Sequence, residues 1–329
     1  MRIGVIGAGA IGGSMAAVLA RAGHDVEVTA RGAHLAAIRE RGIRLEGGWG
    51  AFTAHVTANP VLTAPAALVI VATKAQDAES AIRDNLEMLE GAVILVVQNG
   101  LDGIATAQRL LPSAEIAGGL SMIAASYLEP GLITVTTPGP THIGGPAAEH
   151  VEQLIGTDAP IVLSDNFEGA QWTKLFINQV NALPAITGLY VQQVIADDGL
   201  RRVLTLSMRE TVRVAFAAGV RFAPIKPLTH GLLWLFANVP VSWAERMPRA
   251  MATRMGSVPN PGSTLQSIRR GQRTEVDYLN GAVVAHGHAP INAALTAMVH
   301  EVEASGSFLS PADVVARVLS PTTGTSHSG

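Results

Sequence analysis

Three polar side chains in the second half of the chain are spaced to share one face of a helix. Lys174, Asn178 and Asn181 are four and three residues apart, and a rotation of about 100° per residue brings them onto one stripe. The residues beside the stripe are apolar, which predicts a buried helix, and Asp165 with Glu168 forms a capping pair at its start. A buried lysine beside two amides must find polar partners or lose its charge. The alternative is a lysine whose charged end reaches solvent, beside two structural amides.

A second group of polar residues follows between positions 261 and 281. Ser263 stands near the start of an expected helix, and Glu275 lies between Thr274 and Asp277, a pair suited to capping another helix. From spacing alone, Ser263 is a helix cap and Glu275 is a first-turn charge on the helix dipole.

The first residues of the chain carry a glycine pattern suited to a dinucleotide. Residues 3–6 predict a buried strand, and a helical pattern runs through residues 14–21. Between them lies G-x-G-x-x-G, whose glycines serve the tight turn, the close approach of the pyrophosphate and helix–strand packing. The helix N-terminus then offers N–H groups and a positive dipole end to the phosphates. The expected cofactor-binding loop residues are Gly7, Ala8, Gly9, Ala10, Ile11 and Gly12. The alternative is a glycine-rich turn without a ligand.

The end of the second expected strand favours NADP(H) over NAD(H). Residues 26–29 alternate as a strand does, and Arg31 follows directly after Ala30. An NAD site would place an Asp or Glu there for the ribose 2′-hydroxyl, whereas a guanidinium binds a 2′-phosphate through two parallel hydrogen bonds. Glu27 lies inside the strand rather than at its tip. The alternative is that Arg31 is a solvated surface residue.

Polar residues also follow two further apolar runs. Residues 67–72 and 93–97 predict buried strands of a parallel sheet, and Lys74 and Asn99 come just after them. Doubly wound sheets bind their ligands beyond the carboxyl ends of the strands. Residues 116–125 and 131–136 are predicted to form a strand pair.

These elements predict an α/β protein with two domains. Residues 1–167 form a Rossmann-type doubly wound sheet, and residues 168–319 form an all-helical domain. Residues 320–329, which contain Pro, Thr, Ser and Gly, predict a disordered tail.

Composition excludes several classes of protein. The net charge is −3 and no basic run is present, so there is no electrostatic case for nucleic acid. The chain has no cysteine, which excludes disulfides and thiolate chemistry. No apolar stretch reaches the roughly 18 residues of a membrane span, and the first strand is too short for a signal peptide. We expect a cytoplasmic enzyme that contacts neither nucleic acid nor membrane.

Two further features leave little support for a metal and leave the oligomeric state open. His286 and His288 are two residues apart and lack companion ligands, so no metal site is expected. Residues 232–247 contain Trp and Met and could form a lid or core, and the apolar part, 232–243, would equally suit a homodimer interface.

Four stretches together resemble the ketopantoate reductase (2-dehydropantoate 2-reductase) family, over nearly the whole chain. They are the glycine loop with Arg31, the strand ends at Lys74 and 98–100, Lys174 with Asn178, and Ser263 with 274–281. The last two are more specific than the glycine loop. The resemblance implies a Rossmann domain, a helical C-terminal domain and an active site in the cleft between them. It also implies NADPH-dependent reduction of ketopantoate, a 2-oxo acid, to (R)-pantoate, on the route to pantothenate and coenzyme A.

The resemblance also assigns roles to individual residues. Lys174 would be the general acid, with Glu275 as its partner. The implied substrate-binding residues are Asn99, Asn178, Asn181 and Ser263, and the implied cofactor-binding residues outside the loop are Arg31, Lys74, Asn99 and Glu275. Hydride delivery leaves negative charge on the ketone oxygen, so a donor must be aimed there. Burial lowers a lysine pKa from about 10.4 toward the useful range, while a nearby glutamate opposes that shift and orients the ammonium.

The sequence departs from the family pattern at three places. The family's second helix asparagine comes one residue later than Asn181, so Asn181 replaces it only if the helix is locally distorted. Ser267 stands where the family often has Asp, and the stretch between Asn280 and Asn292 is short. The alternatives are therefore an NADPH-dependent reductase of another 2-oxo acid or ketone, and a non-catalytic NADP(H)-sensing protein.

Overall fold

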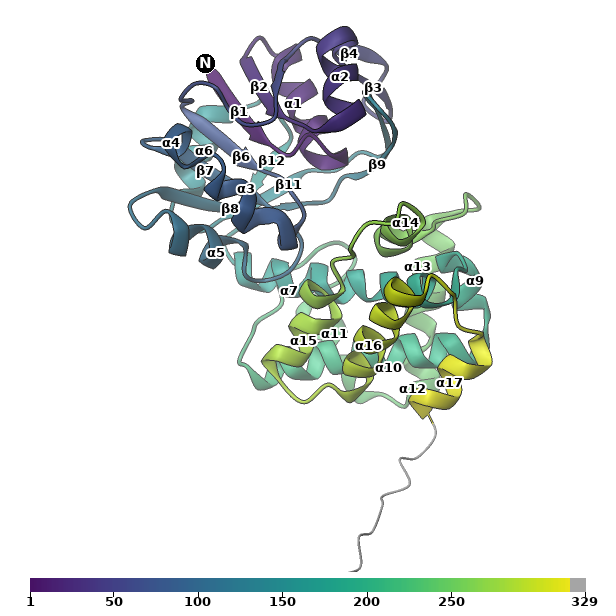
Figure 1. The fold of residues 1–329 in the computed structure, drawn as a ribbon. Coiled ribbons are helices and arrows are strands. Elements are labelled where there is room, and N and C mark those ends of the chain that lie inside the picture. The colour runs from purple at the N-terminus through teal and green to yellow at the C-terminus, as the bar shows by residue number, and fades with distance from the viewer. Residues whose placement is uncertain (320–329) are drawn as a thin grey trace, which may run out of the picture. The chain divides into compact units, whose positions relative to one another are not determined.

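A computed structural model describes residues 1–319, which form two compact units, Met1–Gln171 and the chain from Trp172 onward. The first unit is built on a largely parallel sheet and the second is helical, so the predicted α/β fold class is confirmed (Figure 1). The division falls inside the helix that begins at Phe167, a few residues beyond the predicted boundary. The predicted tail, 320–329, lies outside the described residues.

The first unit, within the described part of the chain, contains an eight-stranded sheet in the order β12-β11-β8-β7-β6-β1-β2-β5. Its strands are β1 (Arg2–Ile6), β2 (Asp25–Thr29), β5 (Thr57–Asn59), β6 (Leu68–Val71), β7 (Val93–Val97), β8 (Glu115–Ser121), β11 (Thr141–Gly144) and β12 (Ile161–Leu163). Neighbouring strands are parallel except for β11, which runs antiparallel to β8.

Apolar side chains leave the two faces of this sheet alternately and fill two cores. Ile3 and Val5 belong to one core, and Ile6 belongs to the other. The first core is covered by α1 (Ala10–Arg21), α2 (Gly32–Arg41) and α6 (Ala148–Ile155). The second is covered by α3 (Ala78–Arg83), α4 (Leu86–Leu89) and α5 (Gly103–Leu110), with the 3-10 turn η1 (Ala75–Asp77) before them. Strands buried on both faces explain the continuous apolar runs in the sequence.

A separate four-stranded sheet, in the order β4-β3-β10-β9, corrects one prediction. Its strands are β3 (Ile43–Gly47), β4 (Phe52–Ala54), β9 (Ala124–Glu129) and β10 (Leu132–Thr137). Residues 116–125 are not one strand, because the chain leaves the main sheet after Ser121 and enters the second sheet at Ala124. The strand pair is therefore β9 with β10, while β8 lies between β7 and β11. A continuous apolar run does not reveal a change of sheet, because both strands are partly buried.

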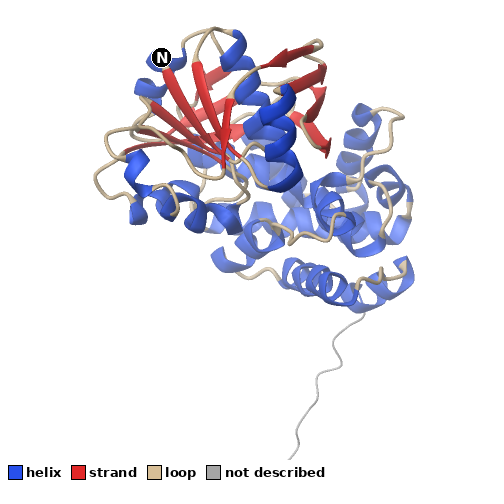
Figure 2. Ribbon diagram, turned by 45° about the horizontal axis from the view of Figure 1, so that its top comes forward, coloured by secondary structure: helices blue, strands red, loops and turns tan. Residues whose placement is uncertain are grey.

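The second unit is made of helices in the region that the structure describes (Figure 2). They are α7 (Phe167–Asn178), η2 (Gln179–Asn181), α8 (Ala182–Thr187), α9 (Val191–Ala196), α10 (Asp198–Ala217), α11 (His230–Asn238), α12 (Val241–Ala244), α13 (Arg246–Met255), α14 (Gly262–Arg269), η3 (Val276–Tyr278), α15 (Asn280–His286), α16 (Pro290–Ser305) and α17 (Pro311–Leu319). The long helix α10 is the centre of the unit and contacts α9, α11, α15, α16 and α17.

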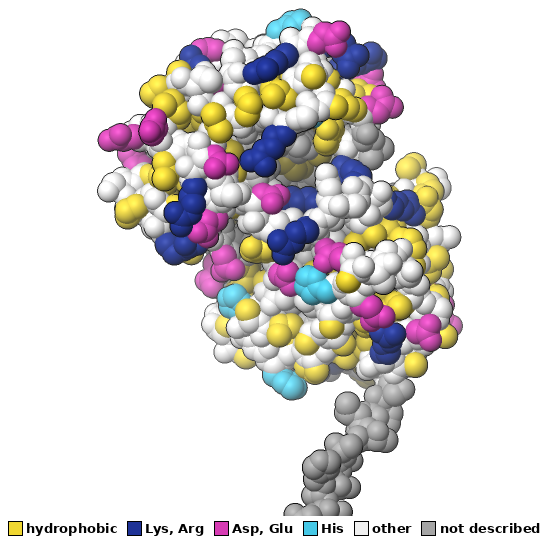
Figure 3. All heavy atoms as spheres, in the orientation of Figure 1, with side chains coloured by type: hydrophobic (Ala, Val, Ile, Leu, Met, Phe, Trp, Pro, Cys, Tyr) yellow, Lys and Arg dark blue, Asp and Glu magenta, His cyan; other side chains and the backbone are white. Residues whose placement is uncertain are grey.

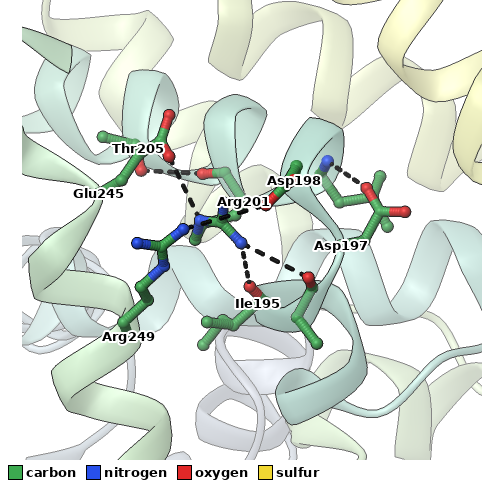
Figure 4. A network of polar contacts seen from close by, with 9 residues as sticks. Ile195, Asp197, Asp198, Arg201, Thr205, Glu245 and Arg249 are labelled. Atoms are coloured by element: carbon green, nitrogen blue, oxygen red, sulfur yellow. Dashed lines mark hydrogen bonds and ion pairs between the residues drawn. The ribbon is translucent and has the colours of Figure 1, made fainter. Parts of the chain in front are cut away.

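Buried Arg201 fixes the start of α10 (Figure 4). Its Nη1 donates to the carbonyl oxygen of Ile195 at 2.9 Å, near the end of α9. Its Nη2 pairs with Asp198, and its Nε lies 3.3 Å from the Glu245 carboxylate, between α12 and α13. These contacts satisfy the carbonyl oxygen of Ile195 in the last turn of α9 and join three helices through one side chain.

Segment 232–247 supplies both core and surface. Leu233 and Phe236 of α11 are buried, whereas Trp234 and Trp243 are more than half exposed.

On the face that Figure 3 shows, Lys and Arg side chains are interspersed with Asp and Glu.

Candidate active site

The glycine loop between β1 and α1 has the geometry of a dinucleotide-binding turn. Gly7 has a φ of +98°, and a Cβ there would lie 2.9 Å from the backbone nitrogen of Thr73. A Cβ on Gly12 would collide with the carbonyl oxygen of Gly7, whereas one on Gly9 would meet nothing within 4 Å. Gly7 and Gly12 are thus required by the turn and the packing, and Gly9 leaves open space beside the loop.

The loop leads directly into the N-terminus of α1. Gly9 is the N-cap residue and makes no side-chain capping bond, and Ala10, Ile11 and Gly12 form the first turn. Ala8 is held from behind, since its N–H donates to the carbonyl oxygen of Thr29 at 2.9 Å. The first-turn N–H groups and the helix dipole suit an anionic group such as a pyrophosphate.

Arg31 lies just beyond β2, where it is the N-cap residue of α2. Its side chain is 79% exposed and pairs with Asp84 at 3.5 Å, so it can turn toward a ligand at little cost. Glu27 is unsuited to a ribose, because its carboxylate accepts hydrogen bonds from Arg2, Asn59 and Thr63. Burial opposes the charge of Glu27, but these bonds lower its pKa nevertheless.

Lys74 and Asn99 follow the neighbouring strands β6 and β7. The two strands are parallel, so their carboxyl ends meet at the same edge of the sheet. Gln98 joins the two ends, because its Nε2 donates to the carbonyl oxygen of Thr73 at 3.1 Å. Lys74 and Asn99 are both partly exposed there.

Lys174 and Asn178 lie one turn apart on α7, as the spacing predicts. Asn178 is buried at the last residue of the helix. The Lys174 side chain is partly exposed, yet enough protein surrounds it that desolvation lowers its pKa to about 8. A lysine with this pKa is mainly protonated at neutral pH and can also give up its proton.

The helix is locally distorted immediately after Asn178. Residues Gln179–Asn181 form the 3-10 turn η2, which joins α7 to α8. The tighter winding changes the direction of Asn181 relative to a regular helix. Its side-chain Oδ1 accepts a hydrogen bond from the backbone nitrogen of Ser263 at 3.1 Å. The structure thus brings Asn181 and Ser263 together, which sequence separation could not reveal.

This contact depends on close approach of two backbone segments. Gly262 begins α14 with a φ of +69°, and a Cβ there would lie 2.7 Å from the Asn181 Oδ1. Ser263 is in the first turn of α14, with an exposed side chain. Asn181 therefore acts as a capping group for α14, contributed from η2.

Glu275 is partly exposed and precedes the short turn η3. Thr274 caps that turn, because its Oγ1 accepts from the backbone nitrogen of Val276 at 3.3 Å. Asp277 does not share in the capping, contrary to the prediction; its carboxylate contacts His300 instead. At the start of α7, the predicted cap Asp165 is also wrong by one position: the Asn166 side chain accepts from the Gly169 N–H at 3.0 Å.

A buried polar network beneath these residues was missed by sequence reasoning. The Oε1 of Gln179 accepts from Ser207 and from the Asn280 amide, each at 2.8 Å. The Ser207 hydroxyl also lies 3.0 Å from the Oδ1 of Asn292, and its single proton serves one of the two acceptors at a time. The Asn280 amide donates to Asn292 as well, and the Nδ2 of Asn292 donates to Glu210 at 2.8 Å. The bond from Asn280 to Gln179 links the segment of Lys174 to the segment of Glu275. The one feature of the sequence that could have indicated this network is Gln179, a polar residue among the apolar residues beside the predicted stripe.

The two halves of the chain match two parts of one protein family. The family described as ketopantoate reductase PanE/ApbA matches residues 3–148, and its C-terminal part matches residues 166–303. The chain belongs to the ketopantoate reductase family. The family predicted from the sequence is therefore confirmed, and membership makes this protein an oxidoreductase.

Individual relatives align with this chain over most of their length. A 2-dehydropantoate 2-reductase of Halobacterium salinarum is 30% identical over 86% of this chain and 91% of its own. That of Pyrococcus horikoshii is 27% identical over 93% of this chain and 99% of its own. The crystal structure of a PanE/ApbA family ketopantoate reductase from Ralstonia eutropha JMP134 is 30% identical, covers 92% of this chain and 99% of its own, and superposes with a TM-score of 0.75. D-mandelate dehydrogenase with NADH and anilino(oxo)acetate, 20% identical, shares the fold with a TM-score of 0.77 over 93% of this chain and 99% of its own.

None of the helices between residues 1 and 319 combines the length and apolar character that crossing a membrane requires. Among the same residues, no group of three or more His, Cys, Asp or Glu is arranged to hold a metal ion.

Proposed function

We propose that this protein reduces 2-dehydropantoate to (R)-pantoate with NADPH, with Lys174 as the general acid. The observation that carries the proposal is Lys174 itself, whose pKa is lowered to about 8 by desolvation one helical turn from Asn178. The 2-dehydropantoate 2-reductase relatives support the choice of substrate. The reaction belongs on the route to pantothenate and coenzyme A, in the cytoplasm.

The residues of the helical unit account for the proton transfer. A bound nicotinamide cofactor supplies the hydride. The Lys174 ammonium donates a proton to the ketone oxygen, where negative charge develops. At neutral pH the Lys174 amine is mainly protonated, because its pKa is about 8. Asn178 and Ser263 offer neutral hydrogen-bonding groups to the substrate, and Glu275 orients the ammonium.

The first unit has the features that a dinucleotide needs. The open space beside Gly9 and the N-terminus of α1 suit the pyrophosphate. Exposed Arg31 suits a 2′-phosphate, and the full hydrogen bonding of Glu27 removes the rival carboxylate. Lys74 and Asn99 lie at adjacent strand ends. Lys74 would lie near the bound NADPH, and Asn99 would hold the substrate or the nicotinamide end of the cofactor.

The glycine loop gives a pair of opposed expectations. Gly9→Ala is expected to leave thermal stability nearly unchanged, because the added Cβ meets nothing within 4 Å and the backbone φ is −69°. It is expected to raise the Kd for NADPH by about tenfold or more, since the methyl group occupies the space of the pyrophosphate. Gly12→Ala is expected to destabilise the protein by about 2 kcal/mol through overpacking against Gly7. Thermal melts and cofactor titrations of both variants check this; equal NADPH binding by Gly9→Ala and wild type would contradict it.

Arg31→Ala is expected to remove the preference for NADPH. Loss of a charge-assisted bidentate contact should raise the KM for NADPH by about tenfold or more and leave the KM for NADH within about twofold. Arg41→Ala is the matched control, since Arg41 is another exposed, ion-paired arginine, at the far end of α2. Steady-state kinetics with both cofactors measure the ratio. An unchanged ratio in Arg31→Ala would assign the preference to other residues.

The position of Asn181 favours a second candidate function, the reduction of another 2-oxo acid. Asn181 lies one residue from the family's usual position, and its Oδ1 is bonded to the backbone of Ser263. If Asn181 caps α14 rather than binding the substrate, the same catalytic residues would accept another 2-oxo acid.

Product analysis tests the main proposal: incubation with ketopantoate and NADPH should yield (R)-pantoate, identified by chiral chromatography. Absence of pantoate together with reduction of another 2-oxo acid would favour the second substrate.

A further inference from the structure

A charged cluster on α16 lies beside the segment that carries Glu275. The Nε2 of His300 is 2.8 Å from the Asp277 carboxylate, and its Nδ1 is 2.7 Å from the Glu303 carboxylate. Asp277 belongs to η3, two residues after Glu275, and Glu303 lies one turn along α16 from His300. The imidazole thus bridges two carboxylates from two elements.

This geometry requires the charged form of His300. A neutral imidazole has one N–H and can donate to one carboxylate only, whereas the imidazolium donates from both nitrogens. Burial disfavours that charge, but the hydrogen bonds to Asp277 and Glu303 outweigh it and raise the pKa of His300 above its usual value. Asp277 and Glu303 are the titratable groups that face His300, since neighbouring Glu301 pairs with Arg317 of α17.

The cluster holds the chain on both sides of Glu275. The second carboxylate oxygen of Glu303 accepts from the backbone nitrogen of Thr274 at 2.6 Å, immediately before Glu275. On the other side, Asp277 is held by His300. Partial burial opposes the charge of Glu303, but its bonds to Thr274 and His300 lower its pKa, so the carboxylate remains ionised. Two anchors on α16 therefore fix the backbone from which the Glu275 side chain projects.

We propose that His300 is a positioning residue, which in its imidazolium form fixes Glu275 through Asp277 and Glu303 and makes turnover depend on its protonation. The inference rests on the proposed function, because it concerns the orientation of the partner of Lys174. As the pH rises through the pKa of His300, one of its two contacts is lost and Glu275 is held less firmly. The deficit caused by removing His300 should then disappear at high pH.

Three variants separate positioning from mere stability. His300→Gln removes the titrating charge, and His300→Arg retains a permanent cation that can bridge two carboxylates. The control is His150→Gln, since His150 is an exposed histidine bonded to Glu115 at 2.9 Å in the other unit. Side-chain exposure is 44% for His300 and 43% for His150, so neither change should disturb a core.

The experiment is kcat/KM for ketopantoate with NADPH from about pH 5.5 to about pH 9.5, together with the titration of His300 by NMR. At about pH 6, His300→Gln should be about tenfold below wild type, and the ratio should approach one at the alkaline end. His300→Arg should restore most of the activity, and His150→Gln should match wild type. The NMR titration should give a pKa for His300 above 6.5.

The outcomes are distinguishable. A ratio for His300→Gln that is constant with pH, or activity equal to that of His150→Gln throughout, would overturn the inference while wild-type turnover upholds the proposed function. A His300 pKa below 6.5 would also overturn it, whatever the turnover. Absence of wild-type turnover with ketopantoate would overturn the proposed function and this inference with it.

Discussion

Lys174→Ala is expected to lower kcat for ketopantoate by about 100-fold or more, which is the usual contribution of a general acid. The substitution removes the only proton donor that we assign to the ketone oxygen. The protein should remain folded, because the side chain is partly exposed and its truncation leaves no fully buried cavity. Steady-state kinetics at saturating NADPH measure the effect.

The pH dependence of turnover is a second test of the role of Lys174. The acid is active when protonated, so kcat/KM, which reports the free enzyme, should fall as the pH rises through about 8, the pKa of Lys174. Lys174→Arg keeps the charge but has too high a pKa to give up a proton, so it should remain slow at every pH. Lys226→Ala, at an exposed lysine of the same unit, is the control and should behave as wild type. A kcat above one tenth of wild type in Lys174→Ala would exclude the general-acid role.

Gln179→Ala is expected to lower the free energy of unfolding by about 3 kcal/mol, the upper range for an unsatisfied buried polar group. Gln179 is fully buried and accepts hydrogen bonds from Ser207 and Asn280. The Ser207 hydroxyl can turn to Asn292, which it already contacts, but one N–H of Asn280 would lose its acceptor. The cavity left by the side chain adds to the loss.

Urea denaturation of the variant measures this effect. The control is Gln108→Ala, where an exposed glutamine on α5 bonds only to the carbonyl oxygen of Pro112 among the contacts we describe. Its expected cost is below about 0.5 kcal/mol. A loss below about 1 kcal/mol in Gln179→Ala would mean that the network relaxes around the vacancy.

The parts of the site that follow from local sequence were predictable. The glycine loop could be predicted because a strand, a turn and a helix stand in sequence, and each glycine has its own steric reason. Lys174 and Asn178 could be placed on one helix face because helical periodicity is local. The fold class followed from apolar runs that alternate with helical patterns.

The remaining features depend on contacts between distant segments. The bond between Asn181 and Ser263 requires both the 3-10 turn η2 and the positive φ of Gly262, and neither has a clear sequence signature. The Asn280–Gln179 bond and the His300 cluster likewise join segments far apart in the chain. The change of sheet after Ser121 was hidden because both strands present apolar residues. Local pattern therefore located the catalytic candidates but not the contacts that hold them.

The kcat/KM of the wild-type protein for ketopantoate, measured beside a panel of other 2-oxo acids with NADPH, tests the proposed reaction most directly. We expect about 10⁴ M⁻¹s⁻¹ or more for ketopantoate, well above every other acid. A preferred acid other than ketopantoate would contradict the substrate while retaining the mechanism. Tight NADPH binding without turnover of any 2-oxo acid would contradict the proposed reaction itself.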